Sequence, residues 1–133
     1  MLSDAEQKIE VMPVKSYREL VVWQKSMDFA AEVYRVTRAF PREEMYGVTS
    51  QLRRAVVSVP SNIAEGQGRG TTGEFRQFLG QVRGSLLEAE TQVLLCERLK
   101  YLDNKTAAAL LEQAGEVGRI LNGLMRSLET PCL

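Results

Sequence analysis

The chain contains no histidine. This absence removes the commonest general base, the commonest zinc ligand and the Glu-x-x-His motif of di-iron helical bundles. Paired carboxylates such as Glu88 and Glu90 remain available for acid–base chemistry, but no nucleophile accompanies them and their pattern is that of a polar helix face. We therefore expect no metal, no cofactor and no enzymatic activity.

Cysteine and long hydrophobic runs are also scarce. Of the two cysteines, Cys96 lies within an apolar helical run and Cys132 is next to the last residue, so neither a CxxC motif nor a disulfide framework is expected. No stretch of 18 apolar residues is available to span a membrane. The N-terminal residues MLSDAEQKIE are rich in acids and carry no secretory or transit signal. We expect no membrane contact and a cytoplasmic location.

Neither sign of charge is in excess, because 17 Lys and Arg balance 17 Asp and Glu. A neutral chain lacks the bulk charge of a nucleic-acid-binding protein, so any positive surface must be local. Hydrophobic residues make up 44% of the 133 positions, which is enough for a globular core. We expect one domain over residues 16–130, with short tails at residues 1–15 and 131–133.

Four segments have apolar residues at helical spacing. Capping boxes at Ser16–Glu19 and Thr71–Glu74 mark two helix starts, because their side chains satisfy free backbone N–H groups. Pro41, the glycine-rich residues 66–70 and Asp103 separate the segments. The expected helices span residues 17–40, 41–65, 71–100 and 103–128. Their short connections predict an all-α, up-down-up-down antiparallel four-helix bundle.

The segment AVVSVPS, residues 55–61, could form a strand instead of part of the second helix, because β-branched residues favour strands. No partner strand is visible elsewhere in the sequence, and an isolated strand would leave its backbone groups unpaired. As part of a helix, the segment continues an apolar stripe spaced four and three residues apart. This stripe comprises Met45, Thr49, Leu52, Val56, Val59 and Ile63.

The first helix has more apolar surface than one corner of a bundle needs. Two neighbouring stripes, one from Leu20 to Thr37 and one from Val22 to Phe40, together cover about 200° of the helix, whereas bundle packing needs about 100°. The surplus predicts a homo-oligomer, because monomers rarely leave such a patch in water. The predicted interface residues are Val22, Phe29, Val33, Val36 and Phe40.

Residues 53–70, RRAVVSVPSNIAEGQGRG, place a proline and several polar residues inside the second helix. Pro60 removes a backbone hydrogen bond and predicts a kink. Polar residues form matching stripes on this helix and on the third, and antiparallel packing would bring the two stripes together. We therefore expect an interhelical polar network of Gln51, Ser58, Ser61, Asn62, Glu65, Ser85 and Glu88.

The glycines of GQGRG, residues 66–70, could belong to a phosphate-binding loop or to a connection between two helices. A Walker motif ends in Gly-Lys-Ser/Thr and a dinucleotide motif follows a strand, and neither condition is met. A helix stop followed by a helix start accounts for these glycines. Arg53, Arg54 and Arg69 border the stretch and are the candidate contacts for a partner or a nucleic acid. Of the first pair, Arg53 is expected to reach solvent or a neighbouring subunit.

Three sequence blocks, RELVVWQK, RRAVVSVPSNIAEG and GSLLEAETQ, resemble a known family. It is the bacterial four-helix bundle family that includes proteins encoded in intervening sequences of large-subunit ribosomal RNA genes. The resemblance covers about residues 17–102, whereas the fourth helix fits in length only. The resemblance to this family implies a homopentameric ring. A related branch, the accessory variability proteins of diversity-generating retroelements, binds reverse transcriptase and nucleic acid through basic surfaces, and this neutral chain departs from that branch.

Two classes of function follow from the residues and the resemblance. In the first, the chain is a self-assembling scaffold or adaptor that binds RNA or an RNA-handling protein. In the second, the scaffold binds proteins only. Salt-dependent retention of RNA distinguishes the two classes, because phosphate contacts release counterions.

Overall fold

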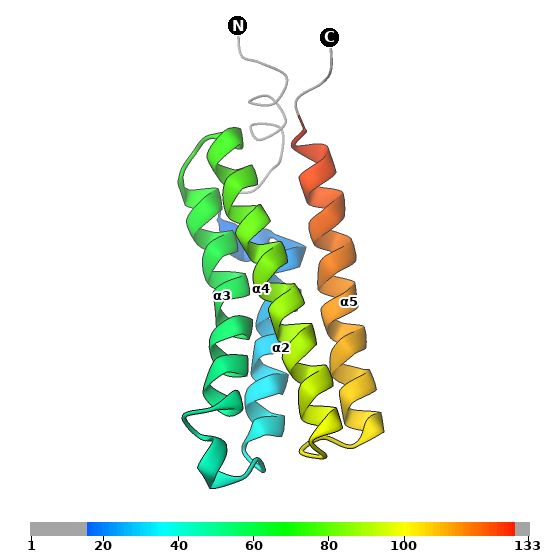
Figure 1. The fold of residues 1–133 in the computed structure, drawn as a ribbon. Helices are drawn as coiled ribbons and strands as arrows, with labels where there is room; N and C mark the ends of the chain where they lie inside the picture. The colour runs from blue at the N-terminus through cyan, green and yellow to red at the C-terminus, as the bar shows by residue number, and fades with distance from the viewer. Residues whose placement is uncertain (1–15, 130–133) are drawn as a thin grey trace, which may run out of the picture.

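The computed structural model describes residues 16–129, which are helical over most of their length and contain no strand (Figure 1). The long helices are α2 (Val21–Thr37), α3 (Val48–Gly68), α4 (Thr72–Arg98) and α5 (Asn104–Ser127), and the short 3-10 helices are η1 (Tyr17–Glu19) and η2 (Arg42–Glu44). The all-α prediction is confirmed, and the strand alternative is wrong because residues 55–61 lie inside α3. The predicted tails, residues 1–15 and 131–133, lie outside the described residues.

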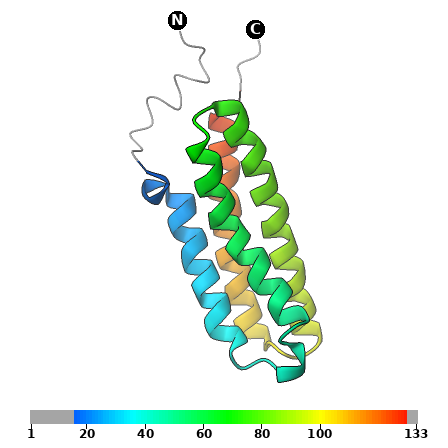
Figure 2. The ribbon, with the colours of Figure 1, turned by 90° about the vertical axis from the view of Figure 1, so that its left-hand side faces the viewer.

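The four long helices lie side by side (Figures 1 and 2). The connection between α3 and α4 lies at the same end of the bundle as the end of α5, whereas the α2–α3 and α4–α5 connections lie at the opposite end. α3 packs against α2 and α4, and α5 packs against α2 and α4. Each long helix therefore has two neighbours and shares one core with them.

Side-chain caps begin three of the helical elements. Ser16 Oγ accepts from the Arg18 N–H at 3.2 Å, and Thr71 Oγ1 accepts from the Glu74 N–H at 3.3 Å. Asp103 Oδ1 accepts from the Thr106 N–H at 2.7 Å. The caps lie where the sequence predicts them, although Ser16 begins η1 and the α-helix starts four residues after the predicted Tyr17, at Val21.

The core is built from the apolar stripes of all four long helices. The apolar stripe of α4, whose residues are three and four positions apart from Phe75 to Cys96, is buried throughout. The predicted stripe of the second helix is buried except for Met45, which is 48% exposed because it precedes the start of α3. Gly66 brings α3 close to α4, since a Cβ at this position would lie 2.6 Å from the Cβ of Phe78.

The residues predicted as an oligomer interface lie inside the chain itself. Phe29 and Val33 are 0% exposed, Val22 is 2% exposed and Phe40 is 9% exposed, while Val36 packs against the core partly buried. These side chains are therefore not a surface for a second copy, and this assignment is corrected. The reason is that the stripe from Val22 to Phe40 is the one that α2 turns toward the core it shares with α3 and α5.

Pro60 is buried within α3, which continues beyond it to Gly68. Two side chains beside it bond to backbone carbonyls of the same helix: Ser58 Oγ donates to the Ala55 carbonyl at 2.9 Å, and Asn62 Nδ2 donates to the Ser58 carbonyl at 2.8 Å. Such bonds compete with the regular backbone pattern and occupy carbonyls close to the proline. The bend predicted at Pro60 stays a prediction.

Candidate functional site

Arg53 is held against α2 rather than directed to solvent. Its Nε donates to Thr37 Oγ1 at 2.9 Å, and its guanidinium lies 4.6 Å from the centre of the Tyr34 ring. Thr37 Oγ1 in turn donates to the Val33 carbonyl at 2.8 Å, which fixes the acceptor. Arg53 is half-buried and Arg54 is exposed. Arg54, and not Arg53 as predicted, is therefore the one of the pair that reaches solvent.

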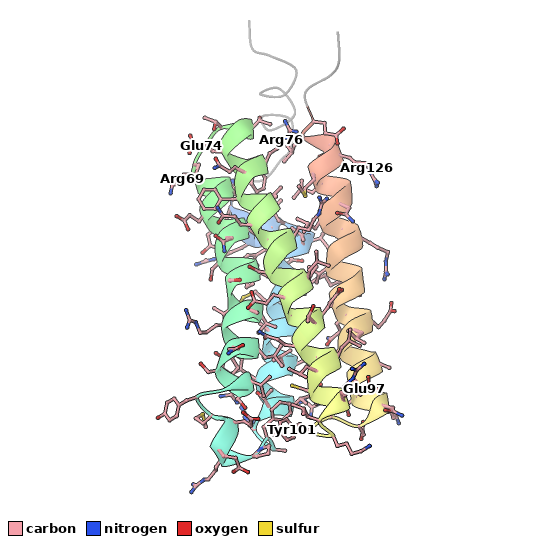
Figure 3. All side chains as sticks on the ribbon, viewed as in Figure 1. Arg69, Glu74, Arg76, Glu97, Tyr101 and Arg126 are labelled. Carbon is pink, nitrogen blue, oxygen red and sulfur yellow. The ribbon has the colours of Figure 1, made fainter. Side chains whose placement is uncertain are left out.

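Arg69 is exposed but has two partners in its own neighbourhood. Its Nη2 lies 3.0 Å from Glu65 Oε1, one helical turn earlier, and its guanidinium lies 5.2 Å from the centre of the Phe78 ring. An exposed pair of this kind contributes only about 0.3–0.5 kcal/mol, so a stronger anion could displace Glu65. Arg69 lies at the α3–α4 connection, where Figure 3 labels it.

Several residues of the predicted polar network line a hollow between α3 and α4. Gln51, Arg54, Ser58 and Glu88 line this polar hollow, whose volume is about 440 Å³. The contact that joins the two polar stripes is Gln92 Nε2 to Gln51 Oε1 at 3.5 Å, which is at the outer limit of a hydrogen bond. The structure therefore brings these four residues together around a space rather than into direct contact.

The remaining residues of that predicted network do not bridge the helices. Asn62 bonds within α3, and Glu65 pairs with Arg69. Ser61 is exposed, Ser85 is half-buried, and within residues 16–129 no hydrogen bond joins either serine to the opposite helix. The residue that does reach across, Gln92, belongs to the same polar stripe of α4 and is 8% exposed.

An apolar groove runs between α2 and α3, and the sequence did not identify it as a site. Its volume is about 460 Å³. The lining includes Tyr17, Trp23, Met27, Tyr34, Val57 and Pro60. Met27, Tyr34 and Val57 are each at least 40% exposed. Three of its residues, Trp23, Met27 and Tyr34, belong to the apolar stripe from Leu20 to Thr37 of the first predicted helix. The spacing of the residues could not show which of the two apolar stripes of that helix is exposed.

A second exposed apolar surface lies on the C-terminal half of α4 and on Leu99, the residue that caps this helix. Leu87, Leu94, Leu95 and Leu99 are 45–56% exposed and form what we call the leucine ridge. They point away from the buried stripe of the same helix. The groove and the ridge thus lie on different faces of the bundle, because α4 is a neighbour of α3 and α5 but not of α2.

The described residues were also compared with what a metal site or a membrane-spanning helix requires. Residues 16–129 contain no group of three or more Cys, Asp or Glu side chains that could hold a metal ion. None of the described helices is long and apolar enough to cross a membrane. Cys96 is buried, and burial together with the nearby Glu44 carboxylate raises the pKa of its thiol to about 11. The thiol is therefore protonated at neutral pH and is a poor nucleophile.

The fold of the described residues defines an all-helical protein of four long helices. Over residues 18–123 the sequence matches the family described as 23S rRNA-intervening sequence protein, and the chain belongs to this family. The resemblance seen in the sequence blocks is confirmed at this level.

A solved structure shows the same fold. It is a protein with unknown function from the S23 ribosomal protein family of Bacteroides thetaiotaomicron, with 20% sequence identity and a TM-score of 0.74. The match covers 80% of this chain and 99% of that chain. No curated protein matches the sequence.

Proposed function

We propose that this chain is a non-enzymatic scaffold or adaptor, an up-down-up-down antiparallel bundle that assembles with copies of itself and binds RNA or an RNA-handling protein. One observation supports the assembly: two different apolar surfaces are exposed on different faces of one bundle. One is the groove between α2 and α3, and the other is the leucine ridge of α4. A soluble monomer rarely exposes surfaces of this kind.

Two different surfaces favour a ring over a symmetric dimer. When a patch on one copy meets a different patch on the next, the contact is heterologous, and repeated contacts close into a ring if the rotation permits. The groove offers an apolar hollow, and the ridge offers exposed leucine side chains to fill it. The resemblance to the family sets the expected number of copies at five.

Mixed variants test this arrangement of the ring. Val57→Glu places a charge in the groove and leaves the ridge intact, whereas Leu94→Glu places a charge on the ridge and leaves the groove intact. Each variant alone should lose the ring. An equimolar mixture should form a species of two chains, because one intact groove and one intact ridge remain to pair.

The matched control is Ala109→Glu, which adds the same charge to an exposed position of α5. It should keep the wild-type mass. Light scattering of the three variants and of the mixture provides the measurement, and circular dichroism checks that each remains helical. Variants that keep the full ring would contradict the proposal.

The RNA part of the proposal starts from the name of the family, which describes its members as 23S rRNA-intervening sequence proteins. It is tested separately, by purifying the native assembly at low salt and sequencing any RNA that it retains. Salt-dependent retention is expected, because contacts with phosphates release counterions. An assembly that retains no RNA would leave the second class, a scaffold whose partners are proteins only.

A further inference from the structure

Three arginines gather around a hollow between α4 and α5, away from the groove and the leucine ridge. The hollow has a volume of about 350 Å³ and is lined by Arg76, Arg83, Asn122, Met125, Arg126 and Glu129. Arg76 and Arg83 lie in the first half of α4, Asn122, Met125 and Arg126 lie near the end of α5, and Glu129 follows that helix. Figure 3 shows Arg76 and Arg126 on the two helices near the same end of the bundle.

The helical register explains why the arginines gather. Arg76 and Arg83 are seven residues apart, which is two turns, so they share one side of α4 at a spacing of about 10 Å along the axis. Arg126 comes from the last turns of α5, which packs against α4. All three side chains are exposed, and Arg83 Nη2 donates to Asn122 Oδ1 at 2.7 Å, which fixes one guanidinium at the rim.

The charge of this arginine hollow is positive in a chain that is neutral overall. Three arginines line it against one carboxylate, that of Glu129. Of the arginines that the sequence singled out, Arg53 is tied to Thr37 and Arg69 is paired with Glu65. Arg54 is exposed, but it is the one arginine of the polar hollow, which it lines together with the Glu88 carboxylate. A local cluster of positive charge therefore lies on the α4–α5 face.

The chemistry of the hollow suits a chain of phosphates better than a protein. Guanidinium groups bind phosphate oxygens through two parallel hydrogen bonds, and several at this spacing can contact successive phosphates of one strand. Protein partners are usually anchored by exposed aromatic or aliphatic side chains, and Met125, which is half-buried, is the one apolar residue in the lining. The lining has no aromatic ring on which a base could stack.

We propose that the arginine hollow binds the phosphodiester backbone of single-stranded RNA without reading its base sequence. This inference rests on the proposed RNA binding and moves its site from Arg53, Arg54 and Arg69 to Arg76, Arg83 and Arg126. Each copy in a ring presents one such hollow, so a single RNA strand can engage several copies at once. Multivalent contact raises the overall affinity without any further contact within a copy.

The test compares two triple variants of the full chain that lose the same charge. The first, R76Q/R83Q/R126Q, removes the arginines of the hollow. The second, R35Q/R69Q/R119Q, removes three arginines that form ion pairs elsewhere on the surface. Fluorescence anisotropy measures the binding of a labelled RNA of mixed sequence, about 20 nucleotides long, at about 50 mM and about 200 mM salt. Light scattering confirms that both variants keep the wild-type mass.

The first variant should bind RNA at least about tenfold more weakly at low salt, and its slope of log affinity against log salt should become shallower by about 2, because each lost phosphate contact with a single strand removes about 0.7 from the slope. The second variant should stay within about twofold of wild type. Equal losses in both variants would overturn the site and leave RNA binding standing. A wild type that binds no RNA at low salt would overturn both.

An acidic protein is the competing occupant of the hollow, and oligoglutamate of matched charge tests for it. The proposal expects unlabelled RNA to displace the labelled RNA and oligoglutamate to displace it far less. Equal displacement by the two competitors would overturn the assignment to RNA.

Discussion

The hydroxyl of Tyr101 donates a hydrogen bond to Glu44 Oε2 at 2.8 Å, although the two residues are 57 positions apart. The Tyr101 ring also packs against Phe40, with ring centres 5.6 Å apart. These contacts tie the α4–α5 connection to the α2–α3 connection at the end of the bundle where Figure 3 labels Tyr101. The hydrogen bond to Glu44 raises the pKa of Tyr101, because it stabilises the protonated phenol.

Tyr101→Phe removes this hydrogen bond and keeps the ring, so it should lower the midpoint of urea unfolding at pH 7. The raised pKa also sets a pH window: the contribution is complete below the unfolded tyrosine pKa of about 10 and is lost as the pH rises through the higher folded value. The difference between wild type and variant should therefore shrink above about pH 10. A difference that stays constant up to pH 11.5 would argue against this bond as its source.

Cys96 should resist alkylation in the folded chain. Its thiol is buried and its pKa is raised to about 11, so both access and thiolate formation are restricted. Iodoacetamide labelling at pH 8, followed by mass spectrometry, measures this in a Cys132→Ser background, where Cys96 is the single thiol. Labelling should become fast only in denaturant. Rapid labelling of the native chain would contradict the burial.

Gly66→Ala should destabilise the chain by about 1–3 kcal/mol, because the added methyl group overpacks the α3–α4 contact. Its Cβ would meet Phe78 at 2.6 Å and Phe75 Cδ1 at 3.2 Å. Gly123→Ala in α5 is the matched control, since nothing lies within 4 Å of a Cβ there. That change should stabilise the helix by about 0.5–1 kcal/mol. Urea unfolding measures both, and the prediction fails if the two substitutions have the same sign.

Asp103→Ala should lower the unfolding midpoint at pH 7, because it removes the cap of α5. The hydrogen bond from the Thr106 backbone holds the pKa of Asp103 below its usual value, so its contribution is present above the unfolded pKa of about 4 and is lost as the pH falls through the lower folded value. Asp103→Asn keeps a capping oxygen and should retain most of the stability at pH 7. An Asn variant as unstable as the Ala variant would show that capping is not the cause.

The elements of this fold could be predicted because local signals agree with it. The residues of the Thr71 and Asp103 caps, and the stripe from Phe75 to Cys96, each specify helix by themselves. The starts of α2 and α3 came later than predicted because Tyr17–Glu19 and Arg42–Glu44 form 3-10 turns instead of α-helix. Helix ends depend on contacts with other segments, which residue spacing does not contain.

The exposed surfaces could be predicted only in part. The sequence indicates that the first helix has more apolar surface than its neighbours can cover. The spacing of the residues could not show which of its two apolar stripes the neighbouring helices cover. Phe29 was assigned to the surface and is buried, whereas Met27 is 44% exposed. The arginine hollow was missed because Arg76 and Arg126 are far apart in sequence, and only the packing of α4 on α5 brings them together.

The central claim is that the chain assembles through its exposed apolar surfaces, and the native molar mass of the wild-type protein tests it most directly. Light scattering during gel filtration gives this mass without assuming a shape. The account predicts a stable multiple of the 14.9 kDa chain mass, with five copies expected from the family resemblance. A mass of 14.9 kDa that persists as the protein concentration is raised would contradict it.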